Sequence, residues 1–297
     1  MKNIIFYITT ILIWGSTWFA IKFQLGRVDP MISIAYRFLL ASVILFIYCF
    51  ISRRNLKFSA KDHLLLFLQG LFSFSISYWL VYLAETRLAS GLVAVICSAL
   101  IFLNIFNGSI FLKTKINRMV LVGATLGMCG IVMIFWTEIK SVSFSDKNFM
   151  ALLFSIAATF VYSLGNILAE YNIKRNIPVI QGNAYSMAYG SMLMLLLAFI
   201  SGKVFEFDAA RSYIFSLFYL SLFGSVIAFY CYFTLIGSIG SDKAAYGPVV
   251  VPVIALSISS LFENYSWSKL AFIGIVILII GNFLVINKKT MSHVRKS

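Results

Sequence analysis

Apolar residues dominate this chain in long runs that short polar segments separate. A helix that crosses a bilayer needs about 20 predominantly apolar residues. Ten runs meet this requirement, which predicts ten membrane-spanning helices and an all-α integral membrane protein. The predicted spans are 3–22, 31–51, 63–84, 91–112 and 118–137, then 148–169, 181–201, 213–236, 243–262 and 268–287. The loops between them are too short to hold a separate soluble domain.

The second half of the chain repeats the first at an offset of 151 residues. The aligned landmarks are Leu71-Phe72 with Leu222-Phe223, Ser90 with Ser241, Arg118 with Lys269, Gly123 with Gly274, and Gly130 with Gly281. Each half would hold five spans, which is an odd number, so the two copies would lie in the bilayer in opposite orientations. We therefore predict two inverted five-helix repeats (5+5), 1–137 and 148–287, within a single membrane domain.

Composition and charge agree with a membrane protein. Hydrophobic residues make up 61% of the chain and charged residues 11%, too few to cover a water-facing surface. The net charge of +14 lies in the gaps between apolar runs and not on one face or stripe, which excludes a nucleic-acid partner. With the N-terminus inside, the cytoplasmic segments hold 15 of the 24 Lys and Arg residues. The positive-inside rule then predicts cytoplasmic N- and C-termini, in the cytoplasmic (inner) membrane of a bacterium.

Cysteine and histidine give no sign of a metal centre. Cys49, Cys97, Cys129 and Cys231 lie singly within apolar runs, and the two histidines lie beside charged segments. We expect no metal, no cofactor and no catalytic residue. We also expect no obligatory protein partner, only membrane lipid and a small-molecule substrate. The first apolar run lacks a small-residue cleavage site, so it reads as a retained helix.

Several short motifs follow one another in a characteristic order. They are Trp14-Gly15-Ser16-Thr17-Trp18-Phe19-Ala20-Ile21-Lys22, Tyr36-Arg37-Phe38-Leu39-Leu40-Ala41, Gly224-Ser225, Tyr230-Cys231-Tyr232, Gly240-Ser241, and Pro252 one helix length before Leu261-Phe262-Glu263. Together with the repeat they make the whole chain similar to the drug/metabolite transporter (DMT) superfamily, in particular its EamA-type ten-helix permeases. The resemblance implies five plus five helices of inverted topology around a central cavity, lined by helices one to four and six to nine.

The resemblance implies transport of small solutes without fixing the substrate, since members carry amino acids, other metabolites, drugs, nucleotide sugars or cofactors. The chain departs from the pattern in one place. Pro252 and Glu263 have no counterparts in the fourth span, where the offset gives Ile101 and Leu112. The fourth helix could therefore bend or pack differently.

Arg37 is the sharpest candidate for substrate binding. It lies about six residues into the second span, where a charge is costly and usually faces a cavity or a partner. The matching segment of the second half has Ser186, so only one copy carries a cation, which suits an anionic substrate group. Two structural alternatives remain open. Arg37 could extend to the outer interface or pair with an acid such as Glu85.

Aromatic and polar residues on several spans complete the candidate cavity. Spacing of four places Trp14 with Trp18, and Tyr78 with Tyr82, on one face of their helices. The alternatives are ordinary packing for the rings and interhelical hydrogen bonding for the amides and hydroxyls. The substrate-binding candidates are Trp14, Thr17, Trp18, Arg37, Tyr78, Tyr82, Ser98, Asn104, Tyr162, Asn166 and Tyr246.

No Asp or Glu lies in the middle of a predicted span. Proton relays in membranes usually use an embedded carboxylate or histidine, so we expect no proton coupling through a buried acid. The sequence predicts a secondary transporter that moves small organic metabolites by alternating access. We expect amino acids or related zwitterionic or anionic compounds, and export rather than uptake. The alternatives are a multidrug efflux carrier and, from other classes, an integral-membrane enzyme or a channel.

Overall fold

The computed structural model describes residues 2–24, 26–88, 93, 96–140, 146–262 and 268–286, and these form helices joined by short loops, with no β-strand among them. The first half contains α1 (Lys2–Lys22), α2 (Pro30–Ile51), α3 (Ala60–Leu71), η1 (Phe72–Ile76), α4 (Ser77–Glu85), α6 (Leu100–Phe111), α7 (Arg118–Ile134) and α8 (Trp136–Lys140). The second half contains α9 (Asp146–Lys174), α10 (Val179–Ile200), α11 (Arg211–Tyr219), η2 (Leu220–Ile227), α12 (Ala228–Ile239), α13 (Ser241–Ala244), α14 (Tyr246–Phe262) and α15 (Lys269–Ile286).

Six helical segments among the described residues are long and apolar enough to cross a bilayer. They are Lys2–Ile21, Pro30–Ile51, Ala60–Glu85, Asn148–Lys174, Val179–Ile200 and Arg211–Ile239. The helices α6, α7 and α15 are apolar but shorter, and the start of the fourth predicted span, 91–92, lies outside the described residues. The all-helical membrane fold is confirmed, and the count of ten spans stays a prediction.

Polar side chains fix where several helices begin. Asp29 caps α2 by accepting the backbone N–H of Met31 at 2.9 Å, and Pro30 occupies the first helical position, where its missing N–H costs nothing. Ser59 caps α3, and Asn117 caps α7, in the same way. These caps place the helix starts at the membrane boundaries that the charge pattern predicts.

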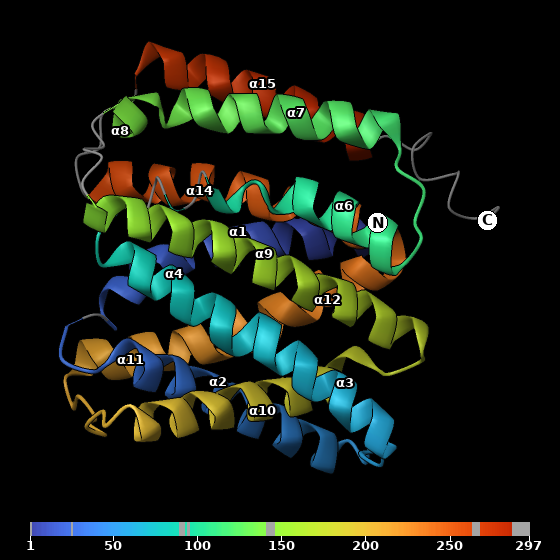
Figure 1. Ribbon diagram of the computed structural model, residues 1–297, viewed down its shortest axis with the longest axis vertical. Helices are drawn as coiled ribbons and strands as arrows, with labels where there is room; N and C mark the ends of the chain where they lie inside the picture. The colour runs from blue at the N-terminus through green and yellow to red at the C-terminus, as the bar shows by residue number, and fades with distance from the viewer. Residues whose placement is uncertain are drawn as a thin grey trace.

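The helices lie in layers, with α7 and α15 outermost on one side and α2 and α10 at the other (Figure 1). Glycines let α7 and α15 meet at their backbones. A Cβ on Gly130 would lie 2.6 Å from the carbonyl oxygen of Gly274, and one on Gly281 would lie 2.8 Å from that of Gly123. Because the residue number rises along one helix as it falls along the other, the two helices are antiparallel.

Two π-helical segments interrupt the longest helices at related positions. The offset of 151 carries η1, Phe72–Ile76, onto the second part of η2. In each segment a serine hydroxyl lies within hydrogen-bond distance of a carbonyl five residues earlier, Ser75 of Gly70 at 3.1 Å and Ser225 of Leu220 at 3.0 Å, and the Ser75 hydroxyl is closer still to the Leu71 carbonyl, at 2.7 Å. The hydroxyl thus satisfies a carbonyl that the wider turn leaves without its usual partner.

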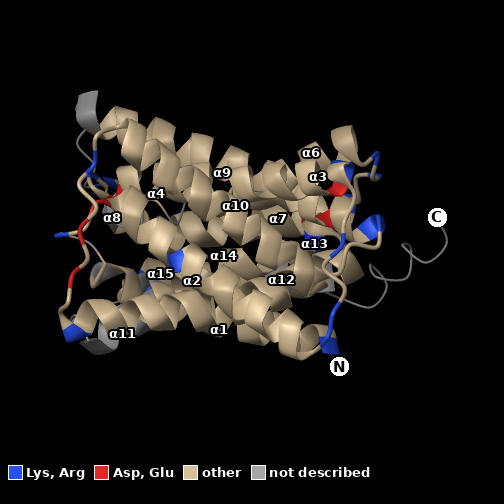
Figure 2. Ribbon diagram, turned by 90° about the horizontal axis from the view of Figure 1, so that it is seen from below, with Lys and Arg blue, Asp and Glu red and all other residues tan. Residues whose placement is uncertain are grey.

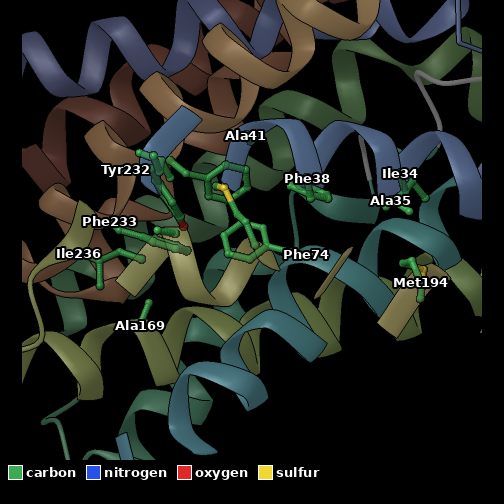
Figure 3. Packing of buried hydrophobic residues seen from close by; sticks show 14 of the residues in the cluster. Ile34, Ala35, Phe38, Ala41, Phe74, Ala169, Met194, Tyr232, Phe233 and Ile236 are labelled. Carbon is green, nitrogen blue, oxygen red and sulfur yellow. The ribbon is translucent and has the colours of Figure 1, made fainter. Parts of the chain in front are cut away.

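Aromatic packing forms the core between the two halves. The rings of Phe38 on α2 and Phe74 on η1 lie 5.1 Å apart (Figure 3). Phe74 also packs against Phe229 on α12. Many large apolar side chains instead point outward, for example Phe50, which is 82% exposed. Such a surface suits lipid and not water. Charged residues gather at the two ends of the bundle (Figure 2).

Candidate functional site

A cavity of about 170 Å³ lies inside the bundle, between helices of both halves. The first half contributes α1, α2, α4 and the segment from Cys97 to Leu100, and the second contributes α9 and α14. Its wall is largely aromatic and aliphatic. The lining residues are Trp14, Thr17, Ile21, Arg37, Ser77, Tyr78, Val81, Tyr82, Cys97, Leu100, Ala158, Thr159, Tyr162, Pro248, Val251 and Pro252.

Arg37 is the one charged residue among the described residues of this lining, and its side chain is held on three sides. It is 2% exposed, and its Nε donates to the Ser225 hydroxyl at 3.0 Å. Its guanidinium carbon lies 5.2 Å from the ring centre of Tyr78 and 5.3 Å from that of Phe38. A Cβ on Gly224 would lie 3.1 Å from Nη2, so glycine leaves the room that the guanidinium needs.

One terminal nitrogen of Arg37, Nη1, is buried without a hydrogen-bond partner among the residues that the structure describes. None of the ion pairs formed by the described residues includes Arg37, so a pair with Glu85 is not observed there. The near-complete burial also argues against an arginine that extends to the interface. A buried cation with a free donor is costly unless an anion completes the site.

Aromatic side chains from three helices hold the rest of the cavity in shape. The Trp14 indole N–H donates to the carbonyl of Gly224 at 3.2 Å, and its ring lies 4.9 Å from that of Tyr232. This contact fixes α1 against η2 and α12. Tyr78 and Tyr82 come from α4, and Tyr162 comes from α9. The predicted residues Trp14, Thr17, Arg37, Tyr78, Tyr82 and Tyr162 therefore share one cavity.

Other predicted residues join helices away from the cavity lining. The Asn104 amide donates to the Ser241 carbonyl at 2.9 Å, and the Asn166 amide donates to the Tyr232 hydroxyl at 3.0 Å. The Tyr246 hydroxyl donates to the Val120 carbonyl. Ser98 is buried but is not part of the lining, and the side chain of Trp18 lies outside the described residues. Asn104, Asn166 and Tyr246 thus form interhelical hydrogen bonds, the alternative to substrate binding given above.

Sequence reasoning missed the contribution of α14 and part of α9. Pro248, Val251 and Pro252 line the cavity from α14, and Ala158 and Thr159 line it from α9. Helical spacing from Tyr162 back to Ala158 and Thr159 is the signal that could have found the α9 residues. A proline inside a helix leaves a carbonyl without its N–H partner, so the α14 backbone is also polar here.

Glu170 is buried at a helix end and has a structural role. Its carboxylate accepts the backbone N–H of Ser241 at 2.8 Å and the Lys174 ammonium at 2.8 Å, which anchors the start of α13. No cluster of His, Cys, Asp and Glu that could hold a metal occurs in the part of the chain that the structure describes.

Comparisons with known proteins identify the family. The model of the EamA-like transporter family matches residues 1–136 and 149–287. The chain is 25% identical to protein PagO of Salmonella typhimurium, over 95% of this chain and 92% of that protein. It is 24% identical to the uncharacterized transporter YoaV of Bacillus subtilis, over 96% of each chain. It is also 24% identical to the uncharacterized inner membrane transporter YedA of Escherichia coli, over 92% of this chain and 87% of the relative.

A solved crystal structure shares the fold, with a TM-score of 0.79 over 99% of each chain at 13% identity. The family match spans both halves of the sequence, and relatives that align along most of its length are named as transporters. The chain therefore belongs to the EamA-like transporter family and is a multi-pass membrane transporter, not an enzyme.

Proposed function

We propose that this protein is a secondary carrier that exposes one cavity alternately to the two sides of a bacterial inner membrane. Two inverted five-helix halves would rock about the cavity between them. The observation that carries this proposal is the α7–α15 pair. Gly130 packs on Gly274, and Gly123 packs on Gly281, while the 151 offset relates Gly123 to Gly274 and Gly130 to Gly281. If the two halves are inverted copies, equivalent helices at their contact pack antiparallel through equivalent residues, as α7 and α15 do.

The proposed substrate is a small organic metabolite with an anionic group, a class that includes amino acids, and the proposed direction is export. The support is Arg37, whose guanidinium, with its N–H donors, is the one charged group among the described residues that line the cavity. Carboxylates accept such donors in short, strong hydrogen bonds. The rings of Trp14, Tyr78 and Tyr162 would contact the apolar part of the substrate. The positive charge of Arg37 would repel lipophilic cations, which are the substrates expected of a multidrug carrier.

Alternating access requires helices that can bend beside the cavity. The π-helical segments lie next to the cavity: Ser77, which lines it, directly follows η1, and Ser225, which accepts from Arg37, lies within η2. A π-helical turn is a weaker point in the helical ladder than an α-helical one. In this proposal the two segments bend in turn as the substrate passes from one side to the other.

Alternating exposure predicts that the cavity residue Cys97 can be labelled from both sides of the membrane. In a protein that keeps Cys97 but has Cys49, Cys129 and Cys231 replaced by alanine, a membrane-impermeant thiol reagent should modify Cys97 in right-side-out and in inverted vesicles. The matched control keeps only Cys49, which is fully buried, and should react from neither side. Labelling of Cys97 from one side alone, under all conditions, would contradict alternating access.

Inverted repeats predict that equivalent positions face opposite sides. Asn117 and Ser268 are related by the 151 offset and stand at the starts of α7 and α15, where their side chains accept backbone N–H groups. In a background without native cysteines, Asn117→Cys should react with the impermeant reagent only from the cytoplasmic side and Ser268→Cys only from the outside. If both react from the same side, the repeats are not inverted.

A further inference from the structure

The cavity lies nearer to one end of the bundle than to the other. The N-terminus, α3 and α13 lie at one end, and α8 and α11 lie at the opposite end (Figure 2). On α1 and α4 the lining residues lie away from the N-terminal end, from Trp14 to Ile21 and from Ser77 to Tyr82, and on α2, which runs back, Arg37 comes early. The charge pattern predicts that the N-terminal end is cytoplasmic, so the cavity lies toward the outer side.

Between the cavity and the cytoplasmic end, Ser241 at the start of α13 is bonded from two sides. The Asn104 amide on α6 donates to the Ser241 carbonyl at 2.9 Å, and the Glu170 carboxylate on α9 accepts the Ser241 N–H at 2.8 Å. All three residues are at most 4% exposed. Asn104 lies about one turn beyond the lining residue Leu100, and Glu170 about two turns beyond Tyr162. We call Asn104, Glu170 and Ser241 the cytoplasmic clamp.

The repeat shows that the clamp has no counterpart at the outer end. α6 and α14 belong to the fourth predicted span of each half, and inverted halves exchange their conformations when a carrier turns from one side to the other. Closure of the outer side would therefore place Ala255 and Ser90 where Asn104 and Ser241 now meet, by the offset of 151. The sequence of α14 contains no side-chain amide, and that of α1, the counterpart of α9, contains no carboxylate.

Other bonds between the halves occur at both ends and do not distinguish the two sides. At the outer end the Gln24 amide, just past α1, donates to the Tyr213 carbonyl on α11 at 2.9 Å. At the cytoplasmic end the Asn172 amide, near the end of α9, donates to the Gln69 side chain on α3 at 2.7 Å. Each bond joins the first helix of one half to the third helix of the other. The clamp, in contrast, can form on the cytoplasmic side alone.

We propose that the cytoplasmic clamp sets the resting state of the carrier: the empty protein is closed to the cytoplasm and open to the outside. It opens inward only when Ser241 parts from Asn104 and Glu170. The inference rests on the proposed function and adds the state in which the carrier waits for its substrate. One net hydrogen bond shifts a two-state equilibrium by roughly fivefold, and a bond to a carboxylate shifts it by more. Two such bonds on one side favour the outward-open state by roughly 30-fold.

The test measures how fast a membrane-impermeant thiol reagent modifies Cys97 from each side, in a protein that keeps only this cysteine and without substrate. Cys97 lines the cavity. The cytoplasmic side is identified as the side from which Asn117→Cys reacts, because Asn117 follows α6 and so lies at the clamp end. With the clamp intact, the outer rate should exceed the cytoplasmic rate by roughly tenfold or more.

Variants of the clamp should change the cytoplasmic rate alone. Asn104→Leu keeps the size of the side chain and removes the donor, so it should raise the cytoplasmic rate about fivefold and leave the outer rate almost unchanged. Glu170→Gln keeps an acceptor oxygen but loses the charge, so it should raise the cytoplasmic rate several-fold. It also serves as the second variant if Asn104→Leu does not fold.

Gln24→Leu is the matched control. Like Asn104, Gln24 is buried, its amide donates one bond of 2.9 Å to a carbonyl of the other half, and its side-chain oxygen has no partner among the described residues. Its bond lies at the outer end. Gln24→Leu should therefore lower the midpoint of thermal unfolding about as much as Asn104→Leu does, without raising the cytoplasmic rate of Cys97 modification.

Three results overturn the clamp: equal rates from both sides in the protein with the clamp intact, a cytoplasmic rate that neither Asn104→Leu nor Glu170→Gln raises, or an equal rise in Gln24→Leu. In each case the modification of Cys97 from both sides still supports alternating access. Failure of the proposed function gives a different result, because Cys97 would then react from one side only, in the intact protein and in every clamp variant.

Discussion

Gly70→Ala is expected to lower the midpoint of thermal unfolding by about 6–12 °C. Gly70 lies where α3 crosses α10, and a Cβ there would lie 2.3 Å from the carbonyl oxygen of Ser186 and 3.0 Å from the backbone nitrogen of Gly190. Neither atom can rotate away, so the two helices must separate. Overpacking of this kind costs roughly 3 kcal/mol, and 1 kcal/mol corresponds to about 2–4 °C in a domain of this size.

The control for this change is Gly127→Ala on α7. A Cβ on Gly127 would lie 3.5 Å from the nearest side-chain atom, in Val249, which is ordinary contact. Helix propensity favours alanine over glycine by about 1 kcal/mol, so Gly127→Ala should leave stability unchanged or raise it slightly. Both variants are measured by the loss of monodisperse protein on heating in detergent. Equal midpoints for Gly70→Ala and wild type would show that α3 and α10 do not meet at Gly70.

The site residues that could be predicted from sequence are those that are costly in free energy to place within an apolar span. Arg37 stands out because a charge within an apolar run must have a reason, and it lines the cavity. Trp14 and Tyr82 were predicted as large amphipathic side chains deep in their spans, and they line the same cavity. The repeat and the apolar runs likewise predicted an all-helical membrane protein, because backbone groups in lipid must be satisfied within helices.

Whether each remaining residue lines the cavity depends on the rotation of its helix about the helix axis, and a single sequence does not contain this information. Asn104 and Asn166 are as deep and as polar as a substrate ligand would be, yet their amides bond to neighbouring helices. Pro248 and Val251 have no polar group in their side chains and still form the cavity wall. The rotation of a helix about its axis comes from packing, for example from the contact of Gly15 with Ile254 that fixes α1 against α14.

The π-helical segments also could not be predicted, because their residues continue an apolar run that reads as one uninterrupted span. What distinguishes them is a serine that reaches a carbonyl five residues back, Ser75 in η1 and Ser225 in η2. Ser225 also receives the Nε–H of Arg37, so the wider turn and the buried cation are linked through one hydroxyl. The segment that we propose to bend and the cation that we propose to bind the substrate thus meet at a single residue.

Arg37→Met is expected to stabilise the empty protein and to abolish its transport. The unpaired buried guanidinium costs several kcal/mol, whereas its hydrogen bond to Ser225 and its contacts with the rings of Phe38 and Tyr78 return about 2–3 kcal/mol. Methionine fills the same space and keeps a favourable contact with the rings, and the Ser225 hydroxyl keeps its bond to the Leu220 carbonyl. The net gain of about 1 kcal/mol should raise the unfolding midpoint by about 2–4 °C.

Transport should fall by roughly 100-fold in the same variant, because the loss of one partner of a buried charged hydrogen bond costs about 2–5 kcal/mol. The two measurements, unfolding of the ligand-free protein and uptake of a small organic anion into proteoliposomes, separate a binding arginine from a structural one. A structural arginine predicts the opposite pattern, with a lower unfolding midpoint in Arg37→Met and partial transport in the fraction that remains folded. A residue that serves substrate binding can destabilise the empty protein, so replacing it raises the free energy of unfolding. An Arg37→Met variant that is more stable and no longer transports would therefore indicate that Arg37 binds the substrate.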